Sequence, residues 1–272
     1  MTSKLGKLAM STVLSTLILG ATLMGIVAVS YAVASDAVNS QMETASFDQS
    51  KYILTSLSDV VKKIMFTPDS SGYVRVSFTN LLPYFTNTQK RLTINITDPS
   101  NQTLNRGYSY PVKAIQIKGG SGVGVSFSED ILGVNTVAFS NTTYTLAYIR
   151  AYQSGGAWLS LDYARARCIF TGVSNYFDGT IYKSYNVIEI TVVNMTFKEF
   201  QPGEITLITA HNAGTRIDTI NKVSKNLMID IGLSDRSQSI RYTLQDLGGN
   251  MQKNAVIRLV TINIEISMLT AG

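Results

Sequence analysis

The fold is decided by one stretch near the start of the chain, "AMSTVLSTLILGATLMGIVAVSYAVASDAVNSQMETASF" at residues 9–47. Residues 8–35 carry no charge, and a bilayer span needs only about 20 apolar residues. Lys4 and Lys7 precede this segment, so the positive-inside rule places the short N-terminus in the cytoplasm and the rest of the chain outside. Three hypotheses share that topology: an export signal that is removed, a membrane anchor, and the buried core helix of a filament.

A second apolar pattern continues the helix beyond the uncharged segment. From Val38 onward, apolar residues recur at helical spacing, at Met42, Ala45, Ile53, Leu57, Val60 and Ile64. No Pro or Gly interrupts residues 26–66, and the turn-forming "TPDSSG" at residues 67–72 ends the pattern. The two segments therefore predict one helix over residues 10–66, on the order of 80 Å long at about 1.5 Å per residue.

Two alternatives to a filament helix follow from the same residues. The "AVA" at residues 32–34 fits the small-residue rule for signal cleavage, which predicts a secreted β protein cut after Ala34. The uncharged run is longer than the 7–15-residue core usual in a signal peptide, which argues against it. A permanently anchored surface protein, such as a surface-layer stalk or a motility-filament stator, would instead keep the whole segment.

Small residues are frequent in the uncharged part of the helix. They allow helix backbones to approach closely in a membrane or a bundle. We therefore expect this helix to pack against copies of itself, through Gly20, Gly25, Ala28 and Ala32.

The N-terminal sequence resembles a known family. "KLAMSTVLSTLILGATLMGIVAVSYAVAS" is similar to the N-terminus of archaeal type IV pilins and the related archaellins and adhesion-filament subunits, and "SQMETASFDQSKYILTSLSDVVKKI" resembles the outer half of their spine helix. The resemblance covers about residues 1–66. It implies that a prepilin peptidase cuts the leader between Ala9 and Met10 or, alternatively, between Gly6 and Lys7.

The resemblance implies a domain organisation and a function. Residues 1–9 would be the leader peptide, residues 10–66 the spine helix, and residues 70–272 an extracellular β domain. The chain would be a structural, non-enzymatic subunit without a cofactor, inserted in the cytoplasmic membrane and then polymerised through its helix into an adhesive filament on the cell surface. Its partners would be copies of itself, the prepilin peptidase, and an assembly ATPase with its membrane platform.

From residue 73 the apolar period changes from that of a helix to that of a strand. "YVRVSF" and "RLTINIT" alternate, and "YTLAYIRAYQSGGAWLSLDYARARCIF" predicts two strands around a Gly-Gly turn. This pattern predicts an antiparallel β-sandwich-like domain after the helix, hence an α+β chain. We expect residues 70–272 to fold alone as a soluble monomer. A strand-exchange filament would instead donate the strongly alternating "RLVTINIEISML" near the C-terminus to a neighbour.

Composition excludes several classes of function. The net charge is +5, with no basic stripe interleaved with aromatic residues, so no nucleic-acid partner is expected. The single cysteine, Cys168, cannot form an internal disulfide or a Cys-rich metal site and is expected in the core. The single histidine, His211, would have to carry any Ser-His nucleophile pair, and nothing local supports one.

Three weaker motifs are interpreted structurally. "GGSGVG" at residues 119–124 lacks the Lys-Ser/Thr of a phosphate-binding loop and predicts a flexible hairpin or loop. Glu129 and Asp130 are expected to be a solvated acidic pair. Candidate N-glycosylation sequons begin at Asn95, Asn101, Asn141 and Asn194, of which the second and third lie near predicted turns.

Overall fold

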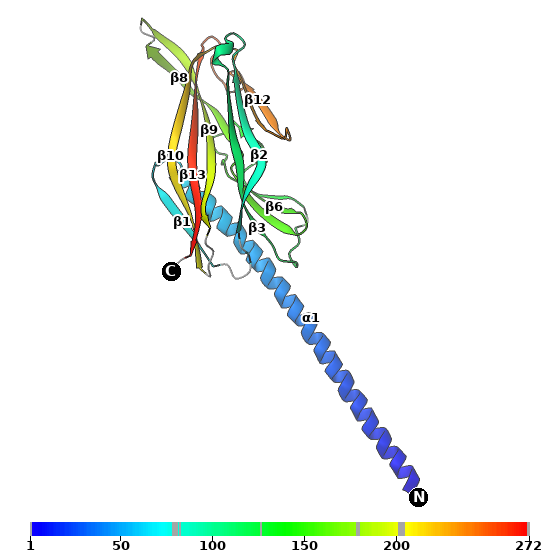
Figure 1. Cartoon of the computed structure of the whole chain (residues 1–272). Helices are drawn as coiled ribbons and strands as arrows, with labels where there is room; N and C mark the ends of the chain where they lie inside the picture. Colours follow the sequence, from blue (N-terminus) through cyan, green and yellow to red (C-terminus); the bar gives the residue numbers. More distant parts are fainter. Residues whose placement is uncertain are drawn as a thin grey trace.

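The chain folds as one long helix followed by a β domain (Figure 1). The computed structural model describes residues 2–77, 81, 83–125, 127–177, 180–200 and 205–270, with the side chains of the helix described from Leu14 onward. α1 (Thr2–Ile64) is continuous over 63 residues, a rod of about 95 Å at about 1.5 Å per residue. The α+β class predicted from the change of apolar period is confirmed.

Two sheets make up the described part of the β domain. The first has the strand order β1 (Ser71–Ser77), β10 (Ile205–Val223), β13 (Ala255–Thr270), β9 (Tyr182–Phe200), β8 (Ala166–Phe177) and β5 (Ala138–Phe139). The second, which is curled, has the order β12 (Ser239–Thr243), β11 (Met228–Leu233), β2 (Pro83–Thr97), β3 (Arg106–Lys118), β7 (Ala157–Asp162), β6 (Tyr148–Gln153) and β4 (Glu129–Leu132). A short 3-10 helix, η1 (Gln102–Leu104), joins β2 to β3. The Gly-Gly turn predicted between two strands lies between β6 and β7.

The pairing is largely antiparallel, as predicted, but two pairs are parallel. β13 runs antiparallel to β10 and parallel to β9, and β5 runs parallel to β8. β13 therefore lies between two strands that follow each other in the chain. The alternating C-terminal sequence thus pairs on both sides within its own chain, and its inward side chains Ile262, Ile264, Ile266 and Met268 are fully buried.

The last part of α1 is inserted between the two sheets. Its contacts run to β1 and β10 on one side and to β7 on the other. Leu54, Leu57 and Val61 are fully buried, together with inward residues of both sheets, in one continuous apolar cluster. A second cluster lies farther from the N-terminus, where the sheets pack directly on each other without the helix. The helix therefore fills the half of the sandwich from which it emerges.

This insertion shows which part of the apolar stripe the β domain covers. Of the predicted stripe, Ile53, Leu57 and Ile64 are buried, but Met42 and Ala45 are exposed because the helix enters the domain only at Phe47. The boundary expected at residue 70 cuts through the core, because residues 47–65 of the helix supply part of it. The folded unit therefore begins within α1.

A side chain from the sheet caps the C-terminal end of α1. The last carbonyl groups of a helix have no partner within the helix and need one from elsewhere. Asn212, fully buried on β10, donates from Nδ2 to the carbonyl oxygens of Ile64, Met65 and Thr67 at 3.0, 3.1 and 3.2 Å. A register shift between Asn212 and Gly214 accompanies this contact. The helix end is thus fixed to the sheet by hydrogen bonds as well as by apolar packing.

Candidate assembly surface on the N-terminal helix

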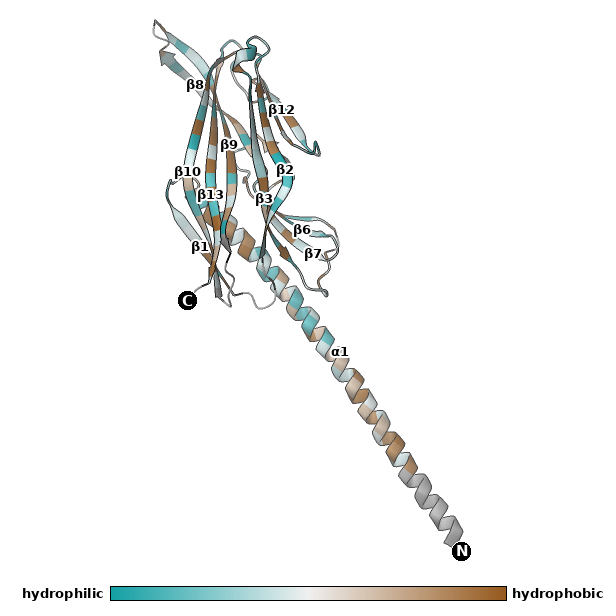
Figure 2. Cartoon of the chain, in the orientation of Figure 1, coloured by the Kyte–Doolittle hydropathy of each residue, from teal (hydrophilic) through white to brown (hydrophobic). Residues whose placement is uncertain are grey.

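The exposed part of α1 is a free-standing apolar rod. Between Leu14 and Val38 the side chains have almost no contact with the rest of the chain, and large ones such as Met24, Val27 and Tyr31 are 78%, 67% and 77% exposed. Figure 2 shows the hydrophobic segment standing clear of the β domain. Isolated exposed apolar residues are normal, but a continuous apolar surface of this size marks a membrane or protein contact. We therefore take this surface as the candidate functional site.

The small residues of the rod gather on one side of the helix. At about 100° per residue, Gly25, Ala28 and Ala32 lie within about 60° of one another around the axis, and Ala21 lies between them. Gly20 lies about 140° from Gly25 by the same measure. Three of the four predicted packing residues thus share one face, and Gly20 does not belong to it.

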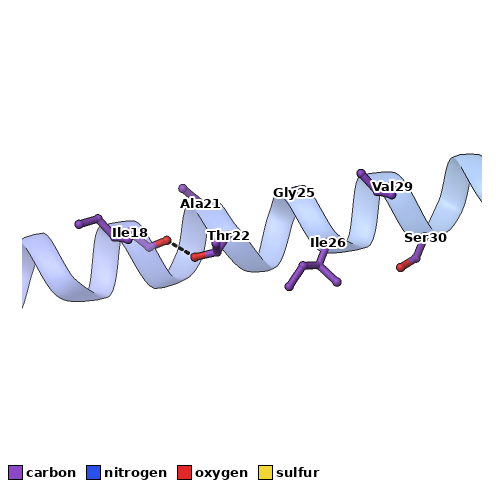
Figure 3. A pocket seen from close by; sticks show the side chains of 7 residues that line it. All are labelled: Ile18, Ala21, Thr22, Gly25, Ile26, Val29 and Ser30. Carbon is purple, nitrogen blue, oxygen red and sulfur yellow. Dashed lines mark hydrogen bonds between the residues drawn. The ribbon is translucent and has the colours of Figure 1, made fainter.

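Gly25 and Ala21 also line a shallow hollow, which does not include Ala28 or Ala32. A Cβ atom added at Gly25 would meet nothing within 4 Å, so no contact within the chain requires glycine there. The hollow is lined by Ile18, Ala21, Thr22, Gly25, Ile26, Val29 and Ser30, whose positions along the helix are drawn in Figure 3. An open notch flanked by β-branched side chains suits the ridge of another helix.

The hydroxyl group of Thr22 on the rod is compatible with apolar surroundings. Thr22 Oγ1 donates to the carbonyl oxygen of Ile18 at 2.5 Å, one turn earlier in the helix. Such a bond to the preceding turn leaves the threonine without an unsatisfied polar donor. Threonine at this position therefore adds a small residue without a large cost in lipid or in a dry helix bundle.

A glycine-rich loop lies against the helix where it leaves the domain. The "GGSGVG" segment is a loop, as predicted, and its Gly122 N–H donates to Glu43 Oε2 at 2.7 Å. A Cβ atom at Gly119 would lie 2.9 Å from Phe47 Cδ2, and one at Gly120 would lie 2.3 Å from Glu43 Cδ. These glycines allow the loop to lie against α1, so they serve close packing rather than phosphate binding. The sequence identified the loop but not its partner.

The acidic pair after this loop is exposed, as predicted, but both of its side chains also contact other residues. Lys51 Nζ on α1 lies 3.1 Å from Asp48 and 3.5 Å from Glu129, whose side chain is 60% exposed. Asp130 accepts a hydrogen bond from the hydroxyl group of Tyr148 at 2.5 Å. Glu129 therefore joins β4 to the helix, and Asp130 orients a tyrosine within the second sheet.

The four sequon asparagines differ in exposure and in hydrogen bonding. Asn101 and Asn141 are exposed, and in each case Oδ1 accepts hydrogen bonds from the N–H and hydroxyl groups of the threonine two positions later, Thr103 and Thr143. Asn95 is exposed on strand β2. Asn194, within β9, is partly buried and donates from Nδ2 to Asn263 at 2.9 Å. The geometry favours the two turn sequons as glycan acceptors over Asn194, whose amide nitrogen is engaged.

Other predicted residues play no part in the helix surface. The leader candidates Gly6, Lys7, Ala9 and Met10 fall on α1, but their side chains lie outside the described part. Cys168 is fully buried, as predicted, and burial raises the pKa of its thiol to about 12.

His211 does have a serine neighbour, which the sequence did not suggest. Its Nδ1 lies 2.9 Å from Ser71 Oγ on the adjacent edge strand β1. Glu265, opposite His211 on β13, forms an ion pair with Lys198 at 2.6 Å instead of orienting the imidazole. The Ser71–His211 contact is therefore not an assembled Ser-His-acid triad.

The chain thus consists of one long helix, apolar in its free part, whose last turns are buried in a β domain. Among the described residues, α1 from Leu14 is the one helix with the length and composition to cross a membrane. Comparisons with protein-family models, with curated proteins and with solved structures found no match.

Proposed function

We propose that this chain is the structural subunit of an extracellular type IV pilus-like filament and polymerises through α1. The observation that carries the proposal is the uncovered apolar rod with a small-residue face at Gly25, Ala28 and Ala32, continuous with a helix end that is locked into the β domain. The helices form the filament core, and the β domains form its outer layer. That layer carries glycans and makes the adhesive contacts with other surfaces.

Assembly moves the rod from lipid to protein. Lipid tails are as apolar as the helix, so the hydrophobic effect alone does not drive association within the membrane. Close backbone approach at Gly25 supplies packing contacts that lipid does not. The prepilin peptidase and an assembly ATPase with its membrane platform are the partners that release and extract the subunit.

The fixed joint between helix and domain supports the same function. Buried Leu54 and Leu57, with the cap from Asn212, leave no linker between the rod and the sheets. The position of each helix in a bundle then determines the position of its β domain. A regular outer layer follows from helix packing alone.

The main alternative is a permanently anchored surface protein, which would also expose this helix to lipid. A simple anchor needs only about 20 apolar residues and no aligned face of small residues. The face at Gly25, Ala28 and Ala32 therefore favours packing against other helices. The secreted alternative, cut after Ala34, would discard this face altogether.

The test compares two glycines that lie on different sides of the same helix. A Cβ atom meets nothing within 4 Å at Gly20 or at Gly25, so Gly25→Leu and Gly20→Leu should both fold and insert, since leucine is favoured in bilayers. We expect Gly25→Leu to reduce the yield of filaments sheared from cells strongly, and Gly20→Leu to reduce it less. Normal yield from Gly25→Leu would contradict the proposed packing and favour the anchor.

A further inference from the structure

A polar groove lies on the face of the second sheet that points away from α1. Along β7, Leu159 and Leu161 point into the helix-containing core, whereas the alternating residues Ser160 and Asp162 line the groove. The groove has a volume of about 330 Å³, at the lower end of the range for small-molecule sites. The segment between β11 and β12, with Ser237 and Gln238, forms its far wall.

The strand register places polar side chains side by side in this groove. Ser160 on β7 lies between Gln116 on β3 and Arg150 on β6, as direct cross-strand neighbours. Across the groove, Gln238 Nε2 donates to Asn135 Oδ1 at 3.1 Å. Hydroxyl and amide groups thus lie around Ser160, a small residue at the base of the groove.

One of the three cations lining the groove forms no ion pair among the described residues. Lys90 is paired with Asp235 at 2.8 Å, and Arg165 with Asp162 at 2.6 Å. Arg150 lies opposite Asp130 of β4 in the strand register, but it forms no ion pair with Asp130, which accepts from Tyr148, or with any other described carboxylate. Its buried Nε has no hydrogen-bond acceptor among the described residues. Its guanidinium group lies over the ring of Tyr152, with 4.8 Å from Cζ to the ring centroid.

A guanidinium group pairs strongly with a carboxylate, and a carboxylate in the groove can accept from the two terminal nitrogens of Arg150 in a bidentate pair. We propose that this groove binds a sugar acid, with the carboxylate on Arg150 and the ring hydroxyl groups on the surrounding amide and hydroxyl side chains. The inference does not depend on the proposed filament.

Two other ligand classes fit the groove less well. An extended peptide binds by pairing with the edge of a sheet, whereas this groove lies on the face of paired strands β3, β7 and β6. A neutral sugar that stacks on aromatic rings is disfavoured, because Arg165 lies over the ring of Tyr148 and Arg150 over that of Tyr152. Charge and hydrogen bonding therefore dominate recognition.

The experiment titrates the full chain, in mild detergent, with three probes by calorimetry. Glucuronate and its methyl glycoside carry the carboxylate, and glucose is the neutral counterpart. Arg150→Gln removes the proposed carboxylate partner. Arg167→Gln is the matched control, because Arg167 also has a buried Nε without a described partner but lies on β8 of the other sheet.

We expect glucuronate to bind wild type and Arg167→Gln, and to bind Arg150→Gln about tenfold more weakly or not at all. Glucose should bind wild type more weakly than glucuronate by a similar factor. Binding of the methyl glycoside would identify the end of a glycan as the source, and binding of glucuronate alone a free sugar acid. Equal binding of glucose and glucuronate by wild type, or no binding of either acid at millimolar concentration, would overturn the proposal without affecting the filament.

Discussion

The insertion of α1 into the β domain predicts that a helix substitution destabilises the sheets. Leu57 is fully buried, with inward residues of both sheets in the same apolar cluster. Truncation of a buried leucine to alanine costs about 2–5 kcal/mol, from the lost transfer free energy and the cavity left behind. We therefore expect Leu57→Ala to cost about 3 kcal/mol of unfolding free energy, within the range that a domain of ordinary stability survives.

The expected change in melting temperature follows from the size of the domain. For a domain of about 150–250 residues, each kcal/mol lowers Tm by about 2–4 °C, so Leu57→Ala should lower it by about 6–12 °C. Trp158, the single tryptophan, lies on β7 and reports unfolding of the second sheet. Its fluorescence, followed during thermal unfolding of the full chain in mild detergent, measures the effect.

Leu23→Ala is the matched control, because Leu23 belongs to the same helix but is 54% exposed on the free rod. Surface substitutions usually change stability by less than about 0.5 kcal/mol, so Tm should move by no more than about 2 °C. If Leu57→Ala has the same Tm as Leu23→Ala, the helix does not stabilise the sheets, and the reasoning about the shared core is refuted.

Three further predictions follow from other parts of the molecule. The fragment 40–272 should be a soluble monomer and the fragment 70–272 should aggregate, because only the first keeps helix residues 47–65 of the core; size-exclusion chromatography that finds both monomeric would contradict this. Burial raises the pKa of the Asp98 carboxyl group, but hydrogen bonds from Ser224 and Ser100 outweigh that and hold the pKa below its usual value. Its contribution is therefore present at neutral pH and lost as pH falls below about 4, so Tm should fall less steeply with acid in Asp98→Asn than in wild type; parallel profiles would refute the role of Asp98. Ala9→Leu should leave uncut protein in the membrane, and normal shortening seen on a gel would move the cut to Gly6.

The helix was predictable because its signal is local. A long uncharged run, followed by residues at helical spacing without Pro or Gly, determines α1 almost to its last turn. What surrounds the helix depends on distant residues, so the apolar stripe that includes Met42 and Ala45 did not show that the β domain covers the helix only from Phe47 onward. The spacing of apolar residues shows which face of a helix is apolar. It does not show at which residue that face begins to contact the rest of the domain.

The strand pattern likewise shows which side chains are buried but not which strand lies beside which. The insertion of β13 between β10 and β9 is therefore invisible in the sequence, although the alternation of "RLVTINIEISML" is plain. Asn212 left only a weak signal, an amide beside Gly214 in an otherwise strand-like stretch. The groove at Arg150 left none, because strands distant in the sequence bring its residues together.

The arrangement of subunits in filaments sheared from cells is the most direct measurement of the central claim. A density map from electron cryomicroscopy should show α1 helices bundled along the filament axis, with the face at Gly25, Ala28 and Ala32 against a neighbouring helix and the β domains outside. Filaments that lack α1 and are joined by β13 exchanged between subunits would contradict the account. So would a chain found only as a detergent-soluble membrane monomer.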